Sequence, residues 1–95
     1  MELSEIKVYC RIDDDYDDSL IEMLKSAAEE YLKGAGVPVK YEDYTYKLTV
    51  LSLVRYYYDE RVSSGAPSEC NDAIIQLQLK YRGSDTWRNK RYLVD

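Results

Sequence analysis

The chain has 95 residues, enough for one domain with a small core, and 45% of them are hydrophobic. It contains no histidine, so the commonest metal ligand and the usual general base near neutral pH are missing. Its net charge of −5 and pI near 4.7 argue against a domain that holds nucleic acid on a broadly basic surface. No apolar run approaches the roughly 18–20 residues of a membrane span, so we expect no membrane association.

Two cysteines, Cys10 and Cys70, stand far apart and in no CxxC or CxxH pattern. That spacing argues against a structural zinc site. One disulfide stays open, but two thiols facing a core are favoured, which fits a reducing cytosol. We therefore expect neither a metal nor a cofactor.

Hydrophobic periodicity predicts a small all-α domain of four helices, of which the first two cover residues 4–11 and 17–33. Ser4 is placed to cap the first helix. The second carries one apolar stripe opposite a polar face, and Gly34, Gly36 and Pro38 follow it as stop signals. The stripe consists of Leu20, Ile21, Leu24, Ala27, Ala28, Tyr31 and Leu32.

The third predicted helix, residues 43–62, has an apolar arc that exceeds half of its circumference, whereas an ordinary surface helix needs about a third. This helix is therefore central, or contacts another subunit, or both. A fourth helix is predicted for residues 68–82, with Ser68 as its cap and Gly83 as its end. The three longer helices each carry an apolar stripe, and the residues in the middle of these stripes are predicted to form one shared core. They are Leu24, Ala28, Tyr31, Leu51, Val54, Tyr58, Ile74 and Leu77.

The helical domain is expected to cover residues 1–83, and residues 84–95 form an extended tail that is basic and aromatic. Residues 1–36 have a net charge of −6, whereas residues 68–95 have a net charge of +1. Head-to-tail packing would bring these opposite charges together. The tail is therefore best interpreted as an arm that docks on a neighbour, with a disordered end and a nucleic-acid contact as open alternatives.

A run of aspartates between residues 13 and 18 suggests a calcium loop, because Asp13, Asp15 and Asp17 match the opening of an EF-hand. The sixth and twelfth positions of such a loop require glycine and glutamate, but Asp18 and Leu24 stand there. Capping of the second helix by these carboxylates explains the run better.

The sequence contains few side chains in arrangements that are typical of catalytic sites. Without histidine, neither a Ser-His nor a Cys-His nucleophile pair exists. The glycines at 34 and 36 lack the following lysine and helix of a phosphate-binding loop. The acids are expected on polar helix faces or in an exposed run, where a carboxylate stays solvated rather than buried for acid–base work. We expect no catalytic residue and no enzymatic activity.

Three consecutive tyrosines, Tyr56, Tyr57 and Tyr58, point in directions 100° apart on a helix and cannot all enter one core. Tyrosine is enriched at protein interfaces, although a packed ring with a solvated hydroxyl is the alternative. The interface that we expect on the third helix and the tail consists of Leu53, Tyr56, Tyr57, Val62, Trp87, Arg88, Lys90, Arg91 and Tyr92.

Several stretches resemble the phage head–tail connector proteins, whose members are also described as possible DNA-packaging proteins. Residues 7–13 (KVYCRID), the acids that follow and the stripe of the second helix are similar to the opening of that family. Residues 47–61 resemble its central helix, with Tyr57-Tyr58-Asp59-Glu60-Arg61 at the end, and residues 74–77 (IIQL) resemble its closing helix. The likeness covers roughly residues 3–82. Cys10 and Glu60 depart from the pattern, and the tail lies outside it.

The resemblance implies a structural adaptor at the head–tail junction of the virion, present in the host cytoplasm before assembly. Its expected partners are further copies of itself in a ring, the portal protein, and tail-completion or tail proteins. Packaged DNA would pass through the ring without specific binding. Two rival interpretations are a helical protein-binding or regulatory module, and a DNA-packaging accessory that touches DNA through its basic tail.

The failed EF-hand spacing gives a first testable prediction. Because the loop lacks its glycine and its bidentate glutamate, sub-millimolar calcium should leave the melting temperature unchanged. Thermal unfolding followed by circular dichroism, with and without calcium, measures this directly. A rise of several degrees would contradict the expectation.

Overall fold

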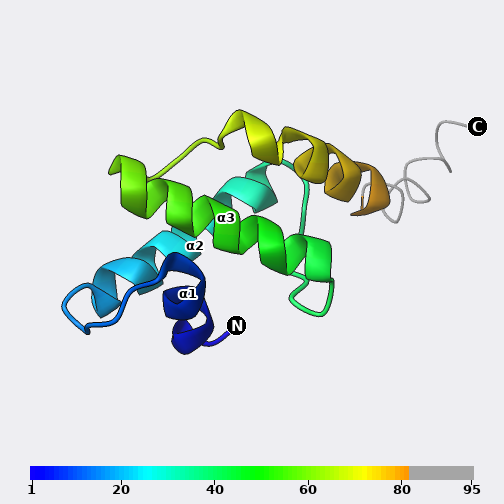
Figure 1. The fold of residues 1–95 in the computed structure, drawn as a ribbon. Helices are drawn as coiled ribbons and strands as arrows, with labels where there is room; N and C mark the ends of the chain where they lie inside the picture. Colours follow the sequence, from blue (N-terminus) through cyan, green and yellow to red (C-terminus); the bar gives the residue numbers. More distant parts are fainter. Residues whose placement is uncertain (82–95) are drawn as a thin grey trace, which may run out of the picture.

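The computed structural model describes residues 1–81, which form four helices and contain no strand (Figure 1). The elements are α1 (Leu3–Cys10), α2 (Asp18–Gly34), α3 (Tyr44–Glu60), the 3-10 turn η1 (Ser68–Cys70) and a helix of residues 71–81, called here the 71–81 helix. None of the helices in this described part is long and apolar enough to cross a membrane. The predicted all-α fold is confirmed.

The ends of three helices share one hydrogen-bond pattern. After α2, Val37 N–H donates to Leu32 O at 2.8 Å and Gly36, with φ of +91°, supplies the left-handed residue. This is a Schellman motif, so the predicted glycine stop is confirmed. Arg11 (φ +59°) and Arg61 (φ +60°) occupy the same left-handed position after α1 and α3. Glycine usually takes that position, because the Cβ of other residues is strained there.

Two of the predicted helix caps, Ser4 and Ser68, are wrong. Glu2, in extended backbone, precedes α1, and the Glu5 carboxylate accepts a hydrogen bond from Glu2 N–H at 3.0 Å. Ser4 therefore lies inside the helix. Ser68 is the first residue of η1, and the extended Pro67 stands before it without a side-chain cap. Neither serine has the non-helical backbone that a cap requires.

Helix α3 lies in the middle of the fold, with α1 and α2 on one side and the 71–81 helix on the other (Figure 1). Helix α1 runs parallel to it, since Lys47 pairs with Glu5 at 2.7 Å and the Tyr9 and Ser52 hydroxyls lie 3.2 Å apart. Helix α2 runs antiparallel to it, and the Tyr58 hydroxyl donates to Asp17 at 2.6 Å.

The core forms around α3, and fifteen hydrophobic side chains are buried in it. Six of the eight residues predicted for the core are among them. Tyr31 and Tyr58 are instead partly buried and pack against its edge, and the Tyr58 hydroxyl binds Asp17 outside the core. The buried set is Ile6, Ile21, Leu24, Ala28, Leu32, Val37, Tyr46, Val50, Leu51, Leu53, Val54, Tyr57, Cys70, Ile74 and Leu77.

One carboxylate connects the start of α3 to the 71–81 helix. Asp43 accepts hydrogen bonds from Thr45 N–H at 2.9 Å and from Tyr46 N–H, and so caps α3. Its other oxygen lies 2.8 Å from the Lys80 ammonium and 2.5 Å from the Tyr81 hydroxyl. These partners lower the pKa of Asp43 to about 2, and Lys80 makes the largest contribution.

The substitution Asp43→Asn should reduce the free energy of unfolding at pH 7 by about 1–2 kcal/mol. Asparagine still caps a helix, so the loss reports mainly on the ionised carboxylate. Because the pKa is lowered on folding, this contribution is complete above the ordinary value of 3.8 and is lost as the pH falls towards about 2. Urea unfolding of both proteins between pH 7 and pH 2 checks this, and a difference independent of pH would contradict it.

Candidate assembly surface

The four described residues of the expected interface differ in how deeply they are buried. Leu53 is 0% and Tyr57 is 1% exposed, so both side chains belong to the core of their own chain. Tyr56 is partly buried, and Val62 is 40% exposed. The remaining candidates, Trp87, Arg88, Lys90, Arg91 and Tyr92, lie outside the described residues.

Tyr57 shows why a tyrosine at this position is a core residue. Its ring is enclosed, and its hydroxyl donates to Gly65 O at 2.8 Å in the loop after α3. Burial raises the pKa of Tyr57 to about 12, so the hydroxyl stays protonated and available to donate. The hydrogen bond satisfies the polar end of a buried side chain, which the sequence periodicity does not reveal.

The wide apolar arc of α3 is used largely within the chain. Helices α1 and α2, η1 and the 71–81 helix surround it, and seven of its residues are buried. Surplus apolar surface on this helix is therefore no longer an argument for a subunit contact along its length. On α3 itself only Tyr44 and Leu48, near its start, are among the exposed large apolar side chains. The others are Val8, Tyr16, Leu20, Met23, Val39, Val62, Ile75 and Leu79.

An open groove lies where α2 begins and α3 ends. Tyr57 and Leu24, which is 6% exposed, belong to its buried part, and Leu20 and Val62, about two-fifths exposed, line it as well. Its volume is about 330 Å³. We call this the α2–α3 groove, and its lining consists of Leu20, Leu24, Tyr57, Tyr58, Arg61, Val62 and Ser63.

The loop of aspartates borders the same end of the fold. Asp17 is the residue before α2, but its side chain caps no backbone N–H and instead accepts from the Tyr58 hydroxyl. Lys7 lies 2.8 Å from both Asp15 and Asp18. These ion pairs raise the pKa of Lys7, and the pair with Asp15 makes the largest contribution. The run therefore ties α1, α2 and α3 together, and side-chain capping of α2, as predicted from the sequence, is wrong for Asp17.

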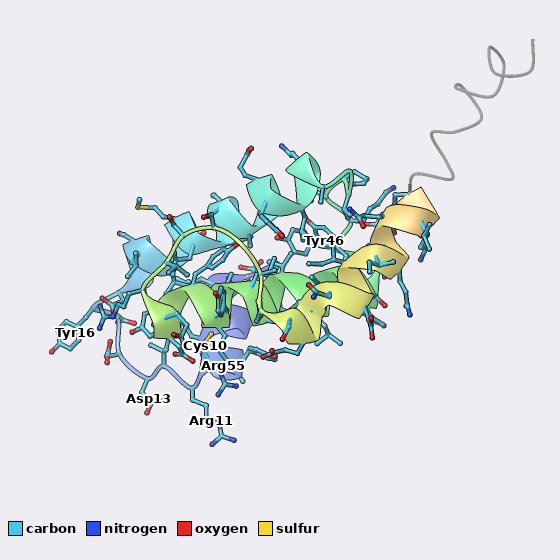
Figure 2. The ribbon with its side chains drawn as sticks, turned by 90° about the horizontal axis from the view of Figure 1, so that it is seen from above. Cys10, Arg11, Asp13, Tyr16, Tyr46 and Arg55 are labelled. Atoms are coloured by element: carbon cyan, nitrogen blue, oxygen red, sulfur yellow. The ribbon has the colours of Figure 1, made fainter. Side chains whose placement is uncertain are left out.

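A second, more polar pocket of about 370 Å³ lies between α1, α3 and η1. Arg55 and Asp59, 3.6 Å apart, line it together with the buried Cys70, and Figure 2 shows Cys10 close to Arg55. Burial raises the pKa of both cysteine thiols, which keeps them protonated and poorly nucleophilic. Both are free thiols.

The described residues contain no group of three or more Cys, Asp or Glu side chains that could hold a metal ion. The α2–α3 groove is lined mainly by aliphatic and aromatic side chains, and the second pocket mainly by charged and polar ones. Surfaces of both kinds occur in contacts between proteins.

The comparisons decide between the interpretations left open by this geometry. The model of one family, described as phage gp6-like head–tail connector protein, matches residues 1–82. The chain belongs to this connector family. No curated protein and no solved structure matches it. The family is one of structural phage proteins, so the helical domain is a component of the head–tail connector rather than an unrelated regulatory module.

The different positions of Tyr57 and Val62 predict different responses to one substitution. Tyr57→Lys places a charge in the core and should cost at least about 3 kcal/mol, a large part of a small domain's stability. Val62→Lys should change the free energy of unfolding by less than about 1 kcal/mol, because the side chain is partly solvated and a cation is favourable after a helix. Denaturant unfolding of both variants measures this, and equal losses would show that Val62 is also a core residue.

Proposed function

We propose that this connector protein assembles as a ring under the portal, extends the DNA channel and provides the surface on which the tail docks. Its partners are further copies of the chain, the portal protein and tail-completion or tail proteins. It resides in the host cytoplasm before assembly and in the virion afterwards. Membership of the connector family carries this proposal, and the charges and exposed side chains of the fold support it.

The charges favour a channel that DNA traverses without being held. Residues 1–81 carry nine Lys or Arg and sixteen Asp or Glu, a net charge of −7. Seven of the nine bases lie within 4.0 Å of a carboxylate of the same chain. Phosphate binding needs bases that are free to replace counterions. A domain with this surface repels duplex DNA rather than retaining it.

The exposed side chains favour contacts at the ends and outer faces of the helices. Leu20 and Val62 belong to the α2–α3 groove, whereas Ile75 and Leu79, one turn apart, lie on the outer face of the 71–81 helix. Tyr56 also lines the polar pocket. Two separate contact regions suit a ring, because a heterologous contact uses a different surface on each side of the subunit. Leu53 and Tyr57 then support these contacts from within the core.

Mixing with purified portal tests the proposal. The intact chain should co-sediment with the portal in a fixed ratio, and electron microscopy of the complex should show an added ring that recruits tails. A chain truncated after Gly83 and the Val62→Lys variant should bind the portal more weakly, whereas Met23→Lys, on an exposed part of α2, serves as the matched control. Failure of the intact chain to bind the portal would contradict the proposal.

The same samples test the rival role in DNA packaging. Duplex DNA should not be retained at physiological salt by the intact chain, because the fold is acidic. Retention that disappears with the truncation after Gly83 would instead favour an accessory that contacts DNA through its tail. Fluorescence anisotropy of a labelled duplex over a salt series measures this.

A further inference from the structure

We propose that the α2–α3 groove of one copy receives residues 86–93 of the next copy, with Trp87 as the anchor. This inference rests on the proposed self-assembly and assigns its contact to a particular surface and a particular segment. It follows from three observations: the lining of the groove, the charges around it, and the place where the described chain ends.

The lining of the groove suits an aromatic side chain. Leu20, Leu24 and Val62 supply aliphatic surface, and Tyr57 and Tyr58 supply two aromatic rings. Aromatic side chains bury large areas and are the commonest anchors of protein interfaces. Residues 86–93 (TWRNKRYL) contain Trp87, Tyr92 and Leu93, and Trp87 is the single tryptophan of the chain.

The charges of the groove and the segment are complementary. Asp17 accepts a hydrogen bond of 2.6 Å from the Tyr58 hydroxyl. This bond is the main reason why the pKa of Tyr58 is raised, and the charge of Asp14 raises it further. Residues 86–93 contain Arg88, Lys90 and Arg91 and no acid. The groove contains one base, Arg61, whose guanidinium is suited to stack on an incoming indole ring. Asp14 and Asp17, which act on Tyr58 at the edge of the groove, outweigh it.

The chain leaves the described fold at the end opposite to the groove. The Tyr81 hydroxyl bonds to Asp43 at the start of α3, whereas Tyr58 and Val62 are at the end of α3 (Figure 1). A helix of this length spans about 24 Å at 1.5 Å per residue. The six residue steps from Tyr81 to Trp87 span at most about 21 Å when fully extended. Docking in the same chain would require this segment to be nearly fully extended along α3, so the groove of a neighbouring copy is the better site for Trp87.

A contact of this kind has a direction. One end of each copy presents an acidic, apolar groove, and Tyr81, after which the basic and aromatic residues follow in the sequence, lies at the other end. Successive copies then associate head to tail, and such a heterologous contact closes into a ring when its rotation permits. The portal supplies a template that holds neighbouring copies in place.

Trp87 provides a direct probe in the intact protein. The full chain, labelled with 5-fluorotryptophan, gives one fluorine resonance, which unlabelled portal does not obscure. On assembly the resonance should shift and broaden as the indole enters the groove. Val62→Lys and Trp87→Ala should weaken assembly at least about tenfold, and Asp14→Asn should weaken it by a smaller factor that vanishes at high salt. The matched controls Met23→Lys, on an exposed part of α2, and Asp72→Asn should leave the resonance shift unchanged.

A complementation experiment separates docking in a neighbour from docking in the same chain. Labelled Val62→Lys protein, which has an intact tail and an altered groove, is mixed with unlabelled Trp87→Ala protein, which has an intact groove. The resonance should shift only in the mixture. A shift in labelled Val62→Lys protein alone would overturn the proposal.

Sedimentation of the same samples keeps this inference distinct from the proposed function. Rings that form on the portal while the Trp87 resonance stays at its free position would overturn the groove contact and leave the adaptor function standing. Rings that form equally well with Val62→Lys, shown to be folded by denaturant unfolding, would do the same. Absence of any assembly, with or without portal, would overturn both.

Discussion

The burial of α3 on several sides is the constraint on which the rest of this structure depends. A chain of this size has one small core, and here that core is built around one helix whose apolar arc is covered by its neighbours. Helix α1 runs parallel to α3 and α2 runs antiparallel, so each contributes one stripe to it. Because the central helix is largely enclosed, most of the exposed apolar side chains lie at the helix ends and on the outer faces of the other helices.

The polar side chains at the helix ends fix how the elements meet. Asp43 caps α3 and binds Lys80 and Tyr81, so one carboxylate sets both the start of the central helix and the position of the last one. At the other end, Lys7 bridges two aspartates, and Tyr58 binds a third. These groups pair acids with bases and hydroxyls of the same chain, and they leave a net negative surface. An acidic surface of this kind is consistent with the proposed DNA channel, because it would not retain duplex DNA.

The helices were predictable because their signals are local. The stripe of α2 and the glycine stop at Gly36 each act within a few residues, and each holds in the structure. The caps at Ser4 and Ser68 were misjudged because capping depends on the backbone conformation of a neighbouring residue, Glu2 in one case and Pro67 in the other. The family could also be recognised from the sequence, because the resemblance depends on the order of motifs along the chain.

By itself, the sequence determined the all-α class, the helix limits to within a few residues and the membership of the connector family. Only the tertiary structure decided which apolar residues are buried within the chain and which stay exposed. Leu53 and Tyr57 share the same wide arc as the exposed Leu48, and periodicity alone cannot rank them, because burial depends on which elements cover each side of the helix. The α2–α3 groove has the same origin: Leu20 and Val62 are 42 positions apart and become neighbours because α2 packs antiparallel to α3.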